Sequence, residues 1–258
     1  MKRWMILSML ATIAFGLSAQ KLSFNEDGTF KIVQFTDMHY RHGDPRSDDN
    51  PTPDRPGSGC REARPGGLHG RYRDRAVCEE GWNRVTAPVI ERGIPFIVTL
   101  GNHDHEYNVT RDEIAALITA YPYNLNSPFG ASPDRVMDNV IPIYGGKRQL
   151  QEKALVYCFD SGDYSSMNGI SGYNWITPDQ IQWYREQSLF YTLKNNHEPL
   201  PAVAYFHIPL PEYRLAFDDD KNTRYGVRKE DECSPVLNTG HVLRDERDGR
   251  RDGYVRGA

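Results

Sequence analysis

The chain has 258 residues, of which 38% are hydrophobic and 26% charged, and its formal net charge is −4. This length allows one substantial domain with a buried core, or two small ones. The small negative charge gives no general reason to expect binding to nucleic acid or to an acidic membrane surface, and after residue 20 no run approaches the roughly 18 apolar residues of a membrane helix.

Residues 1–19 have the pattern of a cleaved secretory signal. Two basic residues open the chain, an almost unbroken apolar run covers residues 4–17, and small residues precede Gln20. An uncleaved anchor is the alternative, although the run is short for a full span. We therefore expect a secreted or periplasmic protein with a single domain at residues 20–258. Its four cysteines allow a disulfide, and free buried thiols are equally compatible with them.

Strands alternate with helices along most of the chain, which predicts an α/β fold. Capping boxes that begin at Thr110 and Thr177 predict helices there, and apolar spacing predicts another from about Trp82 to Arg92. Apolar, β-branched runs of strand length predict the strands, with the second expected to be central and covered on both faces. These runs are residues 22–24, 29–35, 96–100, 154–159 and 201–206.

Three of the predicted strands end in side chains that can bind a metal ion. Asp37 and His39 follow the second strand, residues 101–106 (Gly-Asn-His-Asp-His-Glu) follow the third, and His207 follows the last. Taken alone, each of these motifs could also be an ordinary polar loop without a metal. Because the carboxyl ends of strands in such sheets carry the chemistry, together they indicate one shared metal site.

Two tracts, residues 41–79 and 241–258, lack any helical or strand period and are rich in Arg, Gly, Pro and Asp. We expect both to be disordered. The Arg-rich composition could suggest a nucleic-acid patch, but the interspersed acidic residues and the lack of stacking aromatics argue against one.

Residues 35–39 (Phe-Thr-Asp-Met-His), 101–106 and 206–209 (Phe-His-Ile-Pro) resemble three motif blocks of the calcineurin-like metallophosphoesterases. The chain is similar in particular to an exported bacterial branch related to purple acid phosphatases. The resemblance covers roughly residues 22–40 and 80–240. It implies a four-layer α-β-β-α sandwich that holds two divalent or trivalent metal ions, of Fe, Mn or Zn, at the ends of its strands.

The resemblance also implies the metal ligands. Asp37 and His39 would bind the first ion, and Asn102 and His207 would bind the second. Two metal ions can clamp the attacking and leaving oxygens of a phosphate ester, and a bound water of lowered pKa is a nucleophile at neutral pH.

The catalytic residues implied by the resemblance are His103 and Asp104. His103 would lie over the leaving group as general acid, because an imidazole titrates near neutrality, and Asp104 would orient its ring.

Two motifs of the family are not found in the sequence. The Gly-Asp block, whose Asp bridges the metals, should fall between His39 and Trp82, and at the late Gly-His-x-His block Leu243 stands where the second His should be. By this count each ion keeps two protein ligands. We interpret residues 41–79 and 241–258 as out-of-frame translation of a G/C-rich gene; the alternative is a lineage that dispensed with tight metal binding.

The expected function is metal-dependent hydrolysis of phosphomonoesters or phosphodiesters by metal-activated hydroxide, impaired in this chain. Its expected partner is the phosphate-ester substrate, without nucleic acid and without a membrane once the signal is cleaved. Two alternatives stay open: a catalytically dead scaffold or fragment that binds phosphate or a partner, and a mononuclear zinc hydrolase, which would need three ligands on one ion.

Overall fold

The computed structural model describes residues 21–36, 38, 40, 42, 71–106, 108–146, 149–218, 231–240 and 253–256. The expected signal therefore lies outside the described residues. The elements are, in chain order, β1 (Leu22–Ser23), α2 (Arg71–Ile90), α3 (Arg111–Thr119), β2 (Asn139–Gly146), β3 (Gln149–Cys158), α4 (Pro178–Lys194), β4 (Ala202–Phe206), α5 (Glu212–Asp218) and β5 (Gly253–Arg256). In the described part of the chain, none of the helices is long and apolar enough to cross a membrane.

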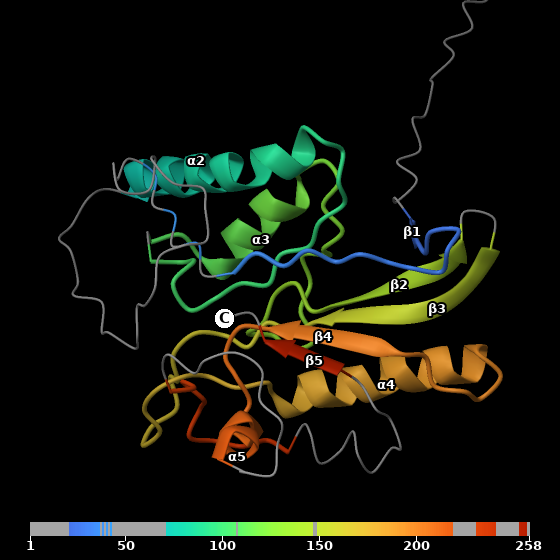
Figure 1. Ribbon diagram of the computed structural model, residues 1–258. Helices are drawn as coiled ribbons and strands as arrows, with labels where there is room; N and C mark the ends of the chain where they lie inside the picture. Colours follow the sequence, from blue (N-terminus) through green and yellow to red (C-terminus); the bar gives the residue numbers. More distant parts are fainter. Residues whose placement is uncertain are drawn as a thin grey trace, which may run out of the picture.

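The strands form one sheet in the order β1-β2-β3-β4-β5 (Figure 1). β2 and β3 make an antiparallel pair, whereas β3 and β4 run parallel from Leu155↔Ala202 to Cys158↔Tyr205. Because β3 and β4 are parallel and aligned, the segments that follow Cys158 and Phe206 leave the sheet at the same edge. This edge is where the sequence predicts chemistry.

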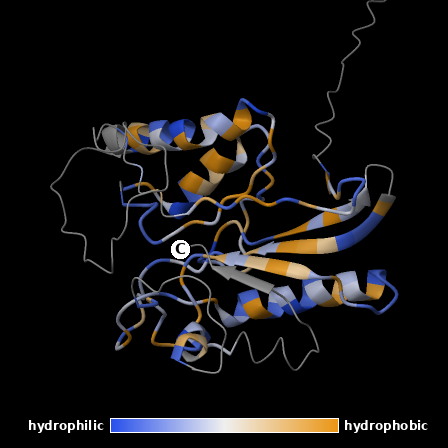
Figure 2. Cartoon of the chain, viewed as in Figure 1, coloured by the Kyte–Doolittle hydropathy of each residue, from blue (hydrophilic) through white to orange (hydrophobic). Residues whose placement is uncertain are grey.

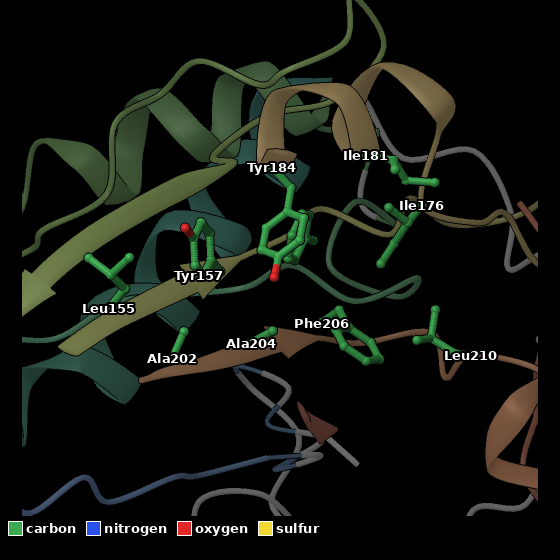
Figure 3. Packing of buried hydrophobic residues seen from close by; sticks show 10 residues of the cluster. Leu155, Tyr157, Ile176, Ile181, Tyr184, Ala202, Ala204, Phe206 and Leu210 are labelled. Atoms are coloured by element: carbon green, nitrogen blue, oxygen red, sulfur yellow. The ribbon is translucent and has the colours of Figure 1, made fainter. Parts of the chain in front are cut away.

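Helix α4 covers one face of the sheet (Figure 3). Thr177 caps its N-terminus and Gln180 completes the capping box, so the helix begins where the sequence predicts. The ring of Tyr184 on α4 meets that of Tyr157 on β3 edge-to-face, with centroids 4.8 Å apart. Such a pair contributes about 0.5–1.5 kcal/mol beyond its buried area. The rest of this core comprises Leu155, Phe159, Ile176, Ile181, Ala202, Ala204, Phe206 and Leu210.

The opposite face of the sheet packs against extended chain and then against α2 and α3 (Figure 1). Phe30 and Ile97, from two extended segments, contact the sheet core around Val156 and Cys158. Beyond them, Ile114 and Ile118 of α3 are fully buried in a second core. Figure 2 shows hydrophobic residues along the sheet and, alternating with hydrophilic ones, along both helices. The mixed α/β prediction is confirmed, with the layers helix, sheet, extended chain, helix.

The extended layer differs from the prediction. Residues 29–35, expected as a covered central strand, and residues 96–100, expected as a strand, belong to no ladder, and Phe96 makes only an isolated bridge to Asn124. Ile32, Val33 and Phe35 are 43%, 59% and 65% exposed. A covered parallel strand needs a neighbour on each side, and residues 41–70 contain no apolar run of strand length to supply one. Around Val98 the Asn126 side chain instead accepts from the backbone N–H at 2.8 Å and donates to the C=O at 3.0 Å.

Both tracts expected to be disordered contain regular structure, so that prediction is wrong in part. Residues 71–79 form the first half of α2, and Cys78 is buried in the core with α3. Residues 253–256 form β5 on the edge of β4. Each piece is stabilised by an adjoining element: residues 71–79 continue into the second half of α2, and residues 253–256 pair with the open edge of β4. Their short sequences therefore need no helical or strand periodicity of their own. Residues 43–70 lie outside the described part.

Candidate active site

The strongest feature of the sheet edge is the contact between Asn102 and His207. Asn102 follows the extended residues 96–100 and His207 follows β4, and the ring Nε2 of His207 lies 2.8 Å from the amide Oδ1 of Asn102. Asn102 is 4% exposed. Gly101 makes this approach possible, because a Cβ at Gly101 would lie 3.2 Å from the His207 ring. The structure thus brings together the two residues expected to bind the second metal.

The distance between these donor atoms fits binding to one ion. Ligands about 2.1 Å from a metal and at about a right angle to each other lie roughly 3 Å apart. An amide oxygen and an imidazole nitrogen also suit iron, manganese or zinc. Asp37 and His39, expected at the first metal, lie outside the described residues. Within the described ranges no three His, Cys, Asp or Glu side chains gather closely enough to hold a metal.

His103 and Asp104, the expected catalytic residues, make different contacts. The ring Nδ1 of His103 meets the carboxylate of Glu106, and both side chains are 43% exposed. Asp104 instead accepts a hydrogen bond of 2.6 Å from the backbone N–H of Gly101, and burial raises the pKa of its carboxyl group. The residue that orients the His103 ring in the structure is therefore Glu106, whereas Asp104 closes the turn that presents Asn102.

The segment after β3 supports the site from behind through Asp160. Its buried carboxylate forms an ion pair with Arg111 at the start of α3, and Arg111 also donates 2.9 Å to the C=O of Gly101. The backbone N–H groups of Val136 and Gly162 donate to the same carboxylate at 3.0 and 2.9 Å. These bonds fix the backbone immediately before Asn102.

The next residues of this segment reach both expected ligands. Ser161 Oγ accepts 2.9 Å from the N–H of Ile208, the neighbour of His207. Tyr164 Oη accepts 3.0 Å from Asn102 Nδ2.

Between Ser161 and Tyr164, Asp163 holds the second histidine of the hexapeptide. Its Oδ2 lies 2.9 Å from Nε2 of His105. Burial raises the pKa of Asp163, but the hydrogen bond and the charge of His105 outweigh it, so the pKa lies below its usual value. Ser161, Asp163 and Tyr164 thus contact the site directly, and Asp160 supports it through Arg111.

Asp138 links residues 160–164 to helix α4. Its Oδ1 accepts from the N–H of Asp160 at 2.9 Å and from Nε2 of Gln180 at 2.8 Å, and its Oδ2 accepts from the N–H of Ala131 at 2.7 Å. Burial nevertheless raises the pKa of Asp138 to about 6, and the nearby Asp160 carboxylate adds to the rise. The capping residue Gln180 therefore also ties the helix to the site.

Sequence reasoning missed the supporting residues Arg111, Asp160, Ser161 and Tyr164. Asp160 and Ser161 could have been noticed, because they are polar residues directly after an apolar strand. Tyr164 carried no signal, because 62 positions separate it from Asn102. Arg111 lies only ten positions after Gly101, but its ion pair with Asp160 spans 49 positions, and this pairing carried no signal.

Comparison with known proteins identifies the class. Residues 30–242 match the calcineurin-like phosphoesterase family, so the chain belongs to this family. Among curated proteins of Arabidopsis thaliana it is similar to "Probable inactive purple acid phosphatase 29", at 30% identity over 90% of this chain and 67% of the relative. "Probable inactive purple acid phosphatase 14" of the same plant is 27% identical over 98% of this chain and 71% of the relative.

A yeast relative is named differently. "Phosphatase DCR2" of Saccharomyces cerevisiae is 30% identical over 60% of this chain, which is 28% of the relative's length. No solved structure matches the chain significantly. The family implies hydrolysis of phosphate esters; one relative is named a phosphatase, and the two plant relatives are named probable inactive purple acid phosphatases.

Proposed function

We propose that the chain is an exported, metal-dependent phosphoesterase of reduced activity, with Asn102 and His207 as ligands of one metal ion. The observation that carries the proposal is the 2.8 Å contact between these two side chains at the carboxyl edge of the sheet. The family membership supports the reaction class. Asp37 and His39 complete the proposed site at the first ion.

Each residue has a definable task in this proposal. A bound metal ion would supply positive charge for the phosphate oxygens and lower the pKa of a water molecule. Asn102 and His207 hold that ion by an oxygen and a nitrogen without adding negative charge. His103 faces solvent with Nδ1 engaged by Glu106, so proton transfer to a leaving oxygen takes place at Nε2.

Export is part of the proposal and rests on residues 1–19 together with the cysteines. Cys233 is disulfide-bonded, whereas Cys78 and Cys158 are buried free thiols, so neither of these is its partner. Disulfides persist in oxidising compartments, which agrees with a secreted or periplasmic location. The bacterial origin suggested by the resemblance belongs to the same proposal.

An inactive scaffold is the second candidate function, and two observations favour it. Both Asn102 and His207 are neutral donors, so this pair alone binds a divalent ion weakly compared with a site that includes carboxylates. Both plant relatives described above are also named "Probable inactive" purple acid phosphatases. A scaffold of this kind would bind a phosphate group without hydrolysing its ester.

Metal content and hydrolysis measured on the same preparations distinguish the two candidates. The full chain is purified, loaded separately with iron, manganese or zinc, and analysed by elemental mass spectrometry. Hydrolysis of p-nitrophenyl phosphate and of bis-p-nitrophenyl phosphate then separates monoesterase from diesterase activity. For an enzyme, Asn102→Ala and His207→Ala each lower both the bound metal and the rate.

The matched control is His197→Asn, which removes an exposed histidine outside the site. His197 has φ of 66° and its neighbour Asn196 has φ of 56°. Asparagine tolerates this left-handed region, so the variant is expected to fold normally. Metal content and rate should both stay at the wild-type level. Bound metal without hydrolysis of either ester would support the scaffold, and metal content indifferent to Asn102→Ala and His207→Ala would refute the assigned ligands.

A further inference from the structure

We propose that Tyr164 is a positioning residue for Asn102, fixing which atom of the amide faces His207. The hydroxyl of Tyr164 accepts a 3.0 Å hydrogen bond from Nδ2 of Asn102, while Oδ1 of the same amide faces the His207 ring at 2.8 Å. The inference rests on the proposed function, because it concerns a ligand of the same metal ion.

The need for such a residue follows from the symmetry of an amide. Its oxygen and nitrogen have nearly the same shape, but only the oxygen has lone pairs for a metal ion. Asn102 is 4% exposed, so an Nδ2 group without an acceptor would be left unsatisfied in a buried place. The Tyr164 hydroxyl supplies that acceptor on the side away from His207, so the oxygen is presented to the ion.

The loop that carries Tyr164 is rigid enough to perform this task. The Tyr164 ring stacks on Tyr173, with centroids 5.4 Å apart and an interplanar angle of 21°. Asn174 Nδ2 donates 3.1 Å to the C=O of Tyr164, and Ser165 N–H donates 2.8 Å to the C=O of Gly172. The two sides of the loop therefore hold each other across residues 164–174.

The entrance to the loop is also fixed. Gly162 has φ of +76°, and a Cβ there would lie 2.9 Å from Cβ of Asn174, so the close approach needs glycine. On the preceding side, Ser161 is fully buried and accepts from Ile208. Tyr164 thus starts from a backbone that is itself tied to the residue after His207, and one loop positions both ligands.

Tyr164→Phe tests the inference, because it removes the hydroxyl and keeps the stacked ring. The matched control is Tyr173→Phe, which removes a hydroxyl from the other ring of the same stack. Two quantities are measured in the full chain: the side-chain amide NMR signals of Asn102 without added metal, assigned with Asn102→Ala, and the affinity for Mn²⁺ by equilibrium dialysis. We expect Tyr164→Phe to shift the Asn102 signals and weaken Mn²⁺ binding about tenfold, and Tyr173→Phe to change neither.

The two readouts separate this inference from the proposed function. Unchanged Asn102 signals in Tyr164→Phe, with Mn²⁺ affinity as in wild type, would overturn the positioning role while the metal site stands. If Asn102→Ala binds Mn²⁺ as tightly as the wild type does, Asn102 is not a metal ligand and the proposed function is contradicted. The NMR signals of the Asn102 amide alone then decide the role of Tyr164. A merely structural role is excluded when both Phe variants unfold at the same temperature and only Tyr164→Phe shifts the amide.

Discussion

Nε2 of His207 lies 2.8 Å from Oδ1 of Asn102, although 105 positions separate the two residues in the sequence. In this contact the imidazole carries a proton on Nε2 and donates it to the amide oxygen. A metal ion would take the place of that proton and bind both atoms. The hydrogen bond therefore holds the two side chains in the arrangement that an ion requires, and it lowers the cost of ordering them on binding.

Gly101→Ala is expected to weaken metal binding about tenfold through displacement of the His207 ring. The new Cβ would lie 3.2 Å from ring atoms of His207, which is too close, so the ring must move by a few tenths of an ångström. The hydrogen bond to Asn102 would then lengthen. Isothermal titration with Mn²⁺ measures the effect.

Gly81→Ala is the matched control, because the same change lies in α2 with nothing within 4 Å of the added Cβ. Replacing glycine by alanine inside a helix stabilises it by about 0.5–1 kcal/mol. The control should therefore raise the melting temperature slightly and leave Mn²⁺ affinity unchanged. Equal affinity in the two glycine variants would contradict the role assigned to Gly101.

The sequence predicts for a local reason that Asn102 and His207 lie close together. Each of the two residues comes at or just after the end of an apolar run, and the ends of such runs meet at one edge of an α/β sheet. Residues 96–100 belong to no ladder, yet the contact with His207 forms. The partner of His103 was harder to predict. Asp104 and Glu106 are both near His103 in the sequence. In the folded turn, the Asp104 carboxylate binds the backbone N–H of Gly101, whereas the Glu106 carboxylate contacts the His103 ring.

The fold prediction succeeds where local signals are strong and fails where order comes from a neighbour. The capping boxes at Thr110 and Thr177 locate α3 and α4 because the bonds that define them are local. Residues 29–35 have the composition of a central strand, yet pairing needs a partner that composition does not reveal. β5 is the reverse case, since four residues become a strand because the edge of β4 is available.

Arg111→Met is expected to destabilise the fold by about 3–5 kcal/mol, because it leaves the Asp160 carboxylate buried without its counter-charge. The Arg111 side chain is 13% exposed and that of Asp160 2%, so water replaces little of the lost interaction. Urea denaturation measures the change. The double variant Arg111→Met with Asp160→Asn should lose much less stability than the sum of the losses in the two single variants. In the double variant no unpaired charge is left buried.

The control for Arg111 is Arg75→Met, which removes an exposed ion pair to the same helix. Arg75 lies 3.7 Å from Glu113, and their side chains are 66% and 44% exposed. Such pairs contribute about 0–1 kcal/mol. If Arg111→Met lowers the free energy of unfolding no more than this control does, the buried ion pair does not stabilise the site.

Asp138 gives the fold a pH dependence with a definite sign. Burial raises its pKa from 3.8 to about 6 in the folded state, so the folded chain binds the proton more tightly than the unfolded chain. Its contribution to stability is fully present below the unfolded value and is lost as the pH rises through about 6. Asp104, whose pKa is also raised by burial, acts in the same direction.

The free energy of unfolding should therefore fall between about pH 4 and about pH 7, with Asp138 responsible for at most about 3 kcal/mol of the fall. Asp138→Asn removes the titration. It also replaces one carboxylate oxygen by an amide N–H₂, so either the N–H of Ala131 or the donors to the other oxygen lose their acceptor. Below about pH 4 the variant is therefore less stable than the wild type by about 1–3 kcal/mol. Urea denaturation of both proteins across this range should show the wild type losing its advantage as the pH rises. A difference that does not change with pH would mean that Asp138 titrates at its ordinary value.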